Sequence, residues 1–405
     1  MKVVGLITEY NPFHKGHKYH IQKAKEMTGA DYIITIMSGD YVQRGTPAIV
    51  EKHVRAHMAL ICGVDLVLEL PIIYATGSAE IFAEGAVRIL DNLGVVDSIC
   101  FGCVCGSASP LLEIARILNN EPKWYSEALQ KYLKGGYSYP AARAAALPEY
   151  ADILNSPNNI LGIEYCKAIL KTDASLEPIG IQRKGNEYHS DELDQHLPSA
   201  TAIRQTLIGT ENNIFNIEDV QYLADHIPQT ALDVFTDHIL KNGIIYENDL
   251  SSMLLYRLLQ AESYLDFLVY EDISKQLASR IFNLRNRFIN FTQFADLIKT
   301  KDITRTHVNR ALLHILLNIR ASIPYASYAR ILGLRKDAKE LLSFIKAKSK
   351  IPFFSKSADA DQLLDEQQLK LFEATTNASM IYEGLKAQNN RIELIHEHSK
   401  AIIIV

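Results

Sequence analysis

The sequence lacks the features of an exported or membrane-bound protein. No apolar stretch approaches the ~20 residues that a transmembrane helix needs. The N-terminus has no basic region followed by an apolar run and a small-residue cleavage site. The five cysteines are an odd number, which does not suit the disulfide framework of a secreted protein. These absences favour a reducing, cytoplasmic compartment and no membrane partner.

Repeats, low-complexity linkers and a strong overall charge are also missing. With 48% hydrophobic and 22% charged residues, the chain is expected to fold and to bury large cores. Its 405 residues exceed the usual size of one domain. The net charge of −5 hides an asymmetry, because residues 275–350 carry sixteen basic and four acidic side chains, near +12, against −17 elsewhere. This asymmetry suits a polyanion-binding surface, although a solvated basic helical surface gives the same pattern.

The first twenty residues carry the most informative pattern. A β-branched apolar run at residues 3–8 predicts a strand, and a helix is expected from near Gly16. Between them lies the sequence Tyr-Asn-Pro-Phe-His-Lys-Gly-His, residues 10–17. Such a turn directs backbone N–H groups and the helix dipole at one point, where a nucleotide phosphate is stabilised. Gly16 lets a phosphate approach the backbone closely.

His14 and His17 flank this glycine and are the candidate catalytic residues. Imidazoles beside a phosphate can donate hydrogen bonds to charge that develops in a pentavalent transition state. A surface turn that happens to hold two histidines is the plainer alternative, but the strand before and the helix after favour a nucleotide site. His-x-Gly-His in this setting resembles the signature of the nucleotidyltransferase and class I aminoacyl-tRNA synthetase superfamily, which attacks the α-phosphate of ATP.

The hydrophobic periodicity predicts an α/β fold. Strands are expected at residues 31–37, 65–71, 95–101 and 179–184, and helices at 49–62, 77–90, within 110–150, and from about 155 to 170. Strand–helix repetition of this kind predicts a doubly wound, mostly parallel, Rossmann-like sheet. Beyond about residue 209 the pattern is mainly helical, including 250–268, 273–288, 305–317 and 326–346, with a short strand at 401–405. We therefore expect an ATP-binding, nucleotidyltransferase-like catalytic domain at 1–209 and a mainly helical domain with a short C-terminal strand at 210–405.

Two polar segments are expected to join the site. The first follows the second predicted strand, at the edge where ligands bind in open parallel sheets. Its candidate substrate or ATP contacts are Ser38, Asp40, Gln43 and Arg44, and Asp40 is a candidate catalytic carboxylate. The alternative is that these four are ordinary loop residues. The second runs from Leu197 to Arg204. Ser199 and helix N–H groups suit phosphate oxygens, and Arg204 can neutralise a leaving pyrophosphate, although a helix cap explains the serine equally well. This segment resembles the superfamily's second signature.

Three other patterns in the sequence have competing interpretations. Asn158 or Asn159 can bind adenine or ribose, with helix capping as the alternative. His53 and His57 have i, i+4 spacing, and Cys100, Cys103 and Cys105 form a trio, but neither set completes a metal site, so no protein-held metal is predicted. Gly102, beside the trio, is the better functional candidate because it permits close backbone approach to a nucleotide. Mg²⁺ is expected only because the chemistry of ATP uses it, and not because the sequence contains a cluster of ligands for it.

Longer motifs point to a particular family. The segments Gly-Leu-Ile-Thr-Glu-Tyr-Asn-Pro-Phe-His-Lys-Gly-His, Ser-Gly-Asp-Tyr-Val-Gln-Arg-Gly, Asp-Leu-Val-Leu-Glu-Leu-Pro and Pro-Asn-Asn-Ile-Leu-Gly-Ile-Glu-Tyr occur in this order. With them the chain closely resembles the bacterial tRNA(Met) cytidine acetate ligase family over essentially its full length. The resemblance implies a ligase that activates acetate with ATP, forms acetyl-adenylate and pyrophosphate, and acetylates N4 of the wobble cytidine of elongator tRNA(Met).

The resemblance also implies functional residues. The ATP contacts, with the two superfamily-signature residues added, are Ile7, Thr8, Glu9, Tyr10, Asn11, Pro12, Phe13, His14, Lys15, Gly16, His17, Lys18, Tyr19, His20, Gly102, Asn158, Arg183, Ser199 and Arg204. The basic helices that would hold the tRNA backbone offer Arg280, Arg285, Arg287, Arg305, Arg310, Arg335 and Lys336. The chain departs from the family pattern after Gly102, where Cys103 and Val104 replace a serine and an acidic residue.

Two other functional classes fit part of the pattern. A nucleotidyltransferase that adenylylates a small phosphorylated metabolite would use the first 210 residues in the same way, but it leaves the basic helical region without a role. A non-catalytic RNA-binding protein would use that region and leave His14, His17 and Arg204 without one.

Overall fold

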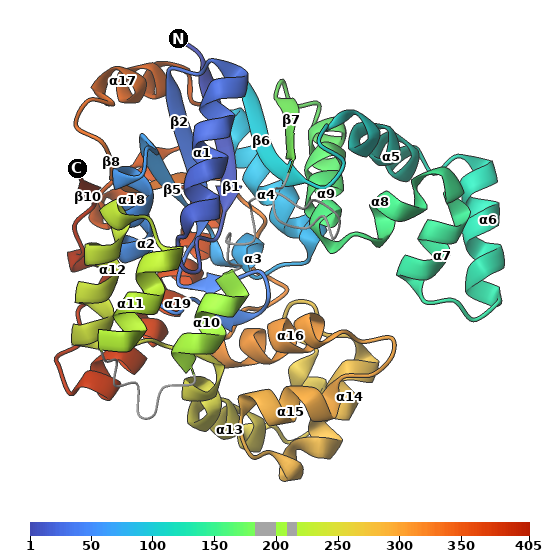
Figure 1. Ribbon diagram of the computed structural model, residues 1–405. Coiled ribbons are helices and arrows are strands. Elements are labelled where there is room, and N and C mark those ends of the chain that lie inside the picture. Colours follow the sequence, from blue (N-terminus) through green and yellow to red (C-terminus); the bar gives the residue numbers. More distant parts are fainter. Residues whose placement is uncertain (183–199, 209–216) are drawn as a thin grey trace.

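The computed structural model describes residues 1–182, 200–208 and 217–405, and a mostly parallel β-sheet lies at its centre (Figure 1). The strands follow the order β10-β8-β5-β2-β1-β6-β7, with β9 beside β8. Five of them come from the first half of the chain: β1 Val3–Thr8, β2 Tyr32–Ser38, β5 Leu66–Leu70, β6 Ser98–Cys103 and β7 Glu177–Gln182. These five pair in parallel, which confirms the predicted sheet and the strands within it.

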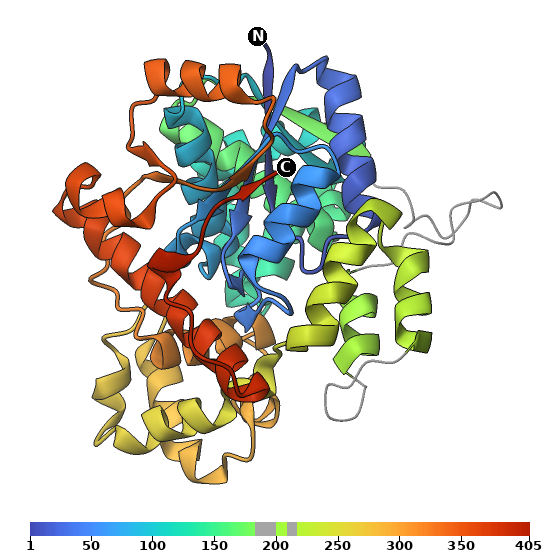
Figure 2. The same cartoon turned by 90° about the vertical axis from the view of Figure 1, so that its left-hand side faces the viewer.

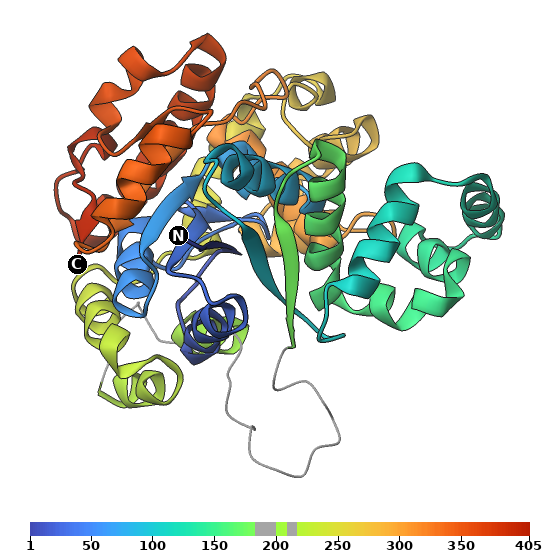
Figure 3. The ribbon, with the colours of Figure 1, turned by 90° about the horizontal axis from the view of Figure 1, so that it is seen from above.

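Helices cover both faces of the sheet, as Figure 3 shows from above. On one face lie α1 Lys15–Thr28 and α2 Lys52–Ile61, and on the other α4 Ala79–Asn92 and α9 Pro157–Thr172. Because successive side chains of a strand point to opposite faces, neighbours such as Val3 and Val4 belong to two separate cores. The fold is therefore doubly wound, as predicted.

The helical part of the second half has a core of its own. This core packs α13 Ser251–Gln260, α14 Lys275–Leu284, α15 Phe291–Ile298 and α16 Arg305–Leu317 together. The other helices of this half are α10 Ala200–Ile208, α11 Ile217–His226, α12 Gln229–Asn242, α17 Lys339–Lys348, α18 Ala360–Leu363 and α19 Glu366–Asn390. Figure 2 shows the long α19, which packs against α16, α12 and the short α3, Ile72–Ala75.

One predicted helix, at residues 326–346, is wrong. Residues Ala329–Leu334 form strand β8, antiparallel to β5, and a helix begins only at Lys339. All six residues of β8 are buried, and its backbone pairs with β5, β10 and β9. Alanine, leucine and arginine favour a helix locally, but burial on both faces and pairing with distant strands decide the conformation here.

The chain therefore returns to the sheet after residue 320. The predicted C-terminal strand is confirmed as β10, Ile403–Ile404, which runs parallel to β8, and the two-residue β9, Phe353–Phe354, pairs with β8 as well. The sheet thus takes strands from both predicted domains. The division at residue 209, which lies outside the described residues, stays a prediction.

A group of helices projects from the sheet and is here named the arm. It consists of α5 Ser109–Asn120, α6 Lys123–Lys134, α7 Tyr139–Ala146 and α8 Ala151–Asn155, inserted between β6 and α9. It stands clear of the sheet at the right of Figures 1 and 3. Among the helices of the described residues, none combines the length and apolar character needed to cross a membrane.

Candidate active site

His14 and His17 form a stacked pair at the start of α1. The Nδ1 atom of His14 accepts a hydrogen bond from the Gly16 N–H at 3.1 Å, and Nδ1 of His17 accepts one from the His14 N–H at 3.2 Å. The ring centroids lie 3.7 Å apart. Because each Nδ1 is an acceptor, each neutral ring carries its proton on Nε2. The pair therefore caps the helix and presents two Nε2–H donors.

Gly16 is required by this cap. A Cβ atom placed on Gly16 would lie 2.9 Å from Cε1 and 3.0 Å from Nδ1 of His14. Any larger residue would push the ring from the first turn of the helix. The glycine therefore has a local structural role in addition to the close phosphate approach expected from the sequence.

Two of the predicted ATP contacts, Tyr10 and Phe13, lie in the core and support His17. Both are buried, and their ring centroids lie 4.9 and 5.6 Å from that of His17. Burial raises the pKa of the Tyr10 hydroxyl well above its usual value, so this group stays protonated. The two aromatic rings pack against the imidazole of His17 and expose almost no surface of their own.

Arg55 of α2 joins the two loops that end β1 and β2. Its guanidinium is fully buried and donates to the carbonyl oxygens of Glu9 at 2.7 Å, Ser38 at 3.0 Å and Gly39, while its Nε donates to Val50 at 3.0 Å. This role is not predicted from the sequence. A signal existed, because Arg55 lies on the same helix as the apolar residues 56 and 58–60.

The loop after β2 is also bound to the histidine turn by two backbone groups. The Gln43 N–H donates to Oε1 of Glu9 at 2.8 Å, and the Ile49 N–H donates to Oδ1 of Asn11 at 2.9 Å. The loop contains the small hairpin of β3 Tyr41–Val42 and β4 Thr46–Pro47. Of the four residues predicted here, Ser38 and Asp40 are buried, Gln43 is half-buried and Arg44 is exposed.

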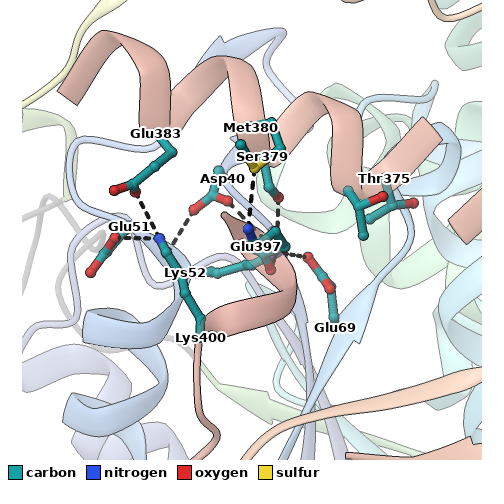
Figure 4. A network of polar contacts seen from close by, with 12 residues as sticks. Asp40, Glu51, Lys52, Glu69, Thr375, Ser379, Met380, Glu383, Glu397 and Lys400 are labelled. Carbon is teal, nitrogen blue, oxygen red and sulfur yellow. Dashed lines mark hydrogen bonds and ion pairs between the residues drawn. The ribbon is translucent and has the colours of Figure 1, made fainter. Parts of the chain in front are cut away.

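Asp40 lies in a buried network of charges (Figure 4). Its Oδ1 accepts the backbone N–H of Lys52 at 2.8 Å, and the Lys52 ammonium lies 3.7 Å from Oδ2. The same ammonium lies 2.6 Å from carboxylate oxygens of Glu69 and Glu397. The structure thus gives Asp40 ion-pair partners in the interior, and its catalytic role stays a prediction.

The network fixes the end of the chain onto α2. Arg330 of β8 bonds Glu69 and Glu397, each at 2.8 Å. Lys400 contacts Glu51 at 2.9 Å and Glu383 of α19 at 2.7 Å. Although burial acts in the opposite direction, the surrounding cations hold the carboxyl pKa values of Glu51 and Glu397 well below their usual range.

Arg204 of α10 reaches the histidine turn, as the second signature predicts. Its guanidinium donates to the carbonyl oxygen of Asn11 at 2.6 Å and to Oγ1 of Thr201 at 3.1 Å. Burial lowers its pKa, while the nearby Glu9 opposes the change. The structure thus brings together residues 193 positions apart. The predicted contacts Arg183 and Ser199 lie outside the described residues.

Of the other predicted ATP contacts, Ile7 and Thr8 end β1, Pro12 lies in the turn before α1, and the rest lie on α1 or near the end of β6 and the start of α9. Lys15 donates to the carbonyl oxygen of Asp225 at 2.7 Å, and Lys18, Tyr19 and His20 are half-buried. Gly102 pairs with Ile181 near the end of β6. The side chain of Asn159 is committed to the backbone, accepting from Val104 N–H at 2.9 Å and donating to the Ile153 carbonyl at 3.2 Å. The side chain of Asn158 lies outside the description.

The described residues contain no group of three or more metal-binding side chains. Cys100, Cys103 and Cys105 are free thiols, and the last two donate to the carbonyl oxygen of Ser107. His53 is buried, and burial and the neighbouring Lys52 lower its pKa to about 4.

The seven residues predicted to bind tRNA do not form one face. Four have their guanidinium groups bound within the helical part: Arg280 to the carbonyls of Leu297 and Ile298, Arg285 to that of Phe282, Arg305 to Asp296, and Arg310 to Asp272. Arg287 is exposed in the same region. Arg335 and Lys336 follow β8 beside the first residue of β5, at the sheet edge opposite the histidine turn. Their role in RNA binding stays a prediction.

A histidine pair at the start of a helix, on the carboxyl edge of a doubly wound sheet, defines a nucleotidyltransferase of the HIGH class. The family described as HIGH Nucleotidyl Transferase matches residues 1–395. A relative from Clostridium novyi, named tRNA(Met) cytidine acetate ligase, is 39% identical over 369 residues, which are 88% of this chain and 90% of the relative. One of the same name from Thermoanaerobacter sp. is 40% identical over 392 residues, 94% and 95% of the two chains. The chain belongs to the tRNA(Met) cytidine acetate ligase family and is a ligase.

Solved structures agree over the whole length. The crystal structure of Thermotoga maritima TmcAL bound with alpha-thio ATP is 29% identical, with a TM-score of 0.87, and covers 100% of this chain and 99% of that one. The apo form of the same protein is 30% identical with a TM-score of 0.88, and the coverage is 100% for both chains. The histidine turn, the arm and the returning C-terminal strands therefore belong to one fold shared with that protein.

Proposed function

We propose that this protein activates acetate with ATP and transfers the acetyl group to N4 of the wobble cytidine of elongator tRNA(Met). In the first step an acetate oxygen attacks the α-phosphorus of ATP, the bond from that phosphorus to the β-bridging oxygen breaks, and pyrophosphate leaves. In the second step the N4 amine attacks the acetyl carbonyl carbon, the bond to AMP breaks, and the amine loses a proton. The products are AMP and N4-acetylcytidine.

The stacked His14 and His17 pair is the observation that carries this proposal. Its two Nε2–H donors, together with the positive end of the α1 dipole, suit the negative charge that develops on the α-phosphate. Arg204, held against the Asn11 carbonyl, would meet the leaving pyrophosphate. The names of the relatives and the ATP analogue bound by the Thermotoga protein support the choice of substrates. Mg²⁺ would arrive with ATP and neutralise phosphate oxygens.

Acetate-dependent exchange of labelled pyrophosphate into ATP tests the first step, and mass spectrometry of digested tRNA(Met) tests the second. Exchange with acetate and no tRNA, followed by a gain of one acetyl group on the wobble cytidine, is the expected result. Exchange that requires a phosphorylated metabolite in place of acetate would overturn the proposal. RNA binding without any exchange would overturn it as well.

A further inference from the structure

The arm is connected to the sheet at the edge that carries the histidine turn. It leaves the sheet where β6 ends at Cys103, next to Gly102, and it returns where α9 begins. Asn159 of α9 closes this base through its bond to the Val104 N–H. Since ligands of open α/β sheets bind outside the carboxyl ends of the strands, the arm flanks the proposed ATP site.

The outward face of α6 combines one large aromatic ring with lysines. Tyr125 and Leu129 are buried against the rest of the arm. Helical periodicity places Trp124 and Lys131, seven residues apart, together on another side, with Lys134 one turn further. Trp124 is 54% exposed. We name Trp124, Lys131 and Lys134 the α6 face.

The charge around this face is positive. Residues 122–143 contain four basic side chains, Lys123, Lys131, Lys134 and Arg143, and one acidic side chain, Glu127. Within the described part of the chain, Lys131 and Lys134 form no ion pair, in contrast to Arg305 and Arg310 of α16. Next to the arm lies a hollow of about 740 Å³ whose lining includes Arg116, Tyr139, Arg143, Lys167 and Lys171, together with Glu80 and Glu121.

We propose that the α6 face binds the tRNA substrate. Trp124 would stack on an unpaired base, and Lys131 and Lys134 would bind neighbouring phosphates. An exposed indole followed along the helix by two ammonium groups matches the two components of single-stranded RNA, a flat base and a charged backbone. An acidic protein partner would give the indole no flat base on which to stack. This inference rests on the proposed function, because that function supplies the RNA.

The fluorescence of Trp124 provides a direct measurement, because it is the single tryptophan of the chain. Titration with an elongator tRNA(Met) transcript is expected to quench this fluorescence as the base stacks on the indole. Binding by the variants at this position, which contain no tryptophan, is measured by filter binding, and Trp124→Ala should raise the Kd for the transcript about tenfold, the loss of one base–aromatic stack. Trp124→Phe should restore most of the affinity, since it keeps an aromatic face. Met27→Ala, at a side chain of equal exposure (53%) near the C-terminal end of α1, is the matched control and should bind as wild type.

The lysines are tested through the salt dependence of binding. The double variant Lys131→Gln, Lys134→Gln should reduce the slope of log Kd against log salt by about 1.5, as expected when two phosphate contacts are lost. Acetate-dependent pyrophosphate exchange without tRNA should be unchanged in every variant, and an unchanged circular dichroism melting curve confirms folding. Suppose that the wild type catalyses acetate-dependent exchange, that tRNA leaves its Trp124 fluorescence unchanged, and that Trp124→Ala binds tRNA with the wild-type Kd. This combination would overturn the inference. Absence of acetate-dependent exchange in the wild type would instead overturn the proposed function.

Discussion

The guanidinium of Arg55 donates to the carbonyl oxygen of Glu9 at 2.7 Å inside a fully buried site. The same Nη1 atom donates to the carbonyl of Ser38, so one side chain of α2 connects the ends of the two central strands. Both strands lead into loops that carry predicted substrate contacts. The geometry of the histidine turn therefore depends on a residue outside it.

Loss of the Arg55 donors is expected to destabilise the protein strongly. Arg55→Met leaves four carbonyl oxygens without their donor, and each buried unsatisfied acceptor costs about 1 to 3 kcal/mol. We expect a loss of at least ~3 kcal/mol in the free energy of unfolding, measured by urea denaturation. Arg44→Met, at an exposed arginine nearby, should stay within about 0.5 kcal/mol of wild type. Equal stabilities for the two variants would contradict the role of Arg55.

Gly45 allows the loop after β2 to touch α16. It has φ +74°, and a Cβ atom there would lie 2.3 Å from the backbone nitrogen of Arg310. Gly45→Ala should therefore cost at least ~2 kcal/mol, from the left-handed backbone together with the clash. Gly136→Ala separates these causes, since Gly136 has φ +83° and open space around it, and it should cost only about 1 kcal/mol. Similar melting temperatures for the two variants would show that the loop moves away from α16 without penalty.

Asparagine at position 14 separates helix capping from catalysis. The side-chain oxygen in His14→Asn can accept from the Gly16 N–H, so stability should match wild type, whereas His14→Ala should lose about 1 kcal/mol. Both variants lack the Nε2–H donor, and acetate-dependent exchange should fall about 10²-fold in each. His57→Asn on α2 should exchange normally. Wild-type exchange in His14→Asn would exclude the imidazole from the chemical step.

The buried His53 predicts a loss of stability on mild acidification. Its folded pKa is about 4, below the unfolded value of ~6.5, so the unfolded chain binds a proton first as the pH falls. Above pH ~6.5 His53 is neutral in both the folded and the unfolded chain and leaves the free energy of unfolding unchanged. Between pH ~6.5 and pH 4 protonation of the unfolded chain lowers the free energy of unfolding progressively, by roughly 3 kcal/mol in total. Urea unfolding of wild type and His53→Gln at pH 7.5, 5.5 and 4.5 measures this. Parallel pH profiles for the two proteins would refute the assignment.

Local patterns in the sequence were sufficient for several individual elements of the fold. The strand at residues 3–8 and the helix at 305–317 were predicted with their exact bounds, because runs of β-branched residues and helical periodicity act over a few neighbouring positions. The histidine turn could be recognised for the same reason, since both histidines and Gly16 lie within four residues. Arg204 could be assigned to the site only through a resemblance, which the structure supports by its contact with Asn11.

Other features depend on segments that are distant in the sequence. Strand β8 is rich in helix-forming residues, and only its neighbours β5, β9 and β10 give its backbone groups partners. The buried charges follow the same rule, because Lys52 meets Glu69 and Glu397 only after the chain end returns to α2. Nothing near Arg280 or Arg310 in the sequence indicates that their guanidinium groups bind the protein itself.

Short-range patterns therefore account for the parallel strands of the first half, the histidine turn and the family. Contacts between distant segments account for the strands that complete the sheet, the buried charges and the open face of the arm. Secondary-structure propensity and capping act between residues a few positions apart, whereas burial, strand pairing and ion pairing depend on which distant segments the folded chain places side by side.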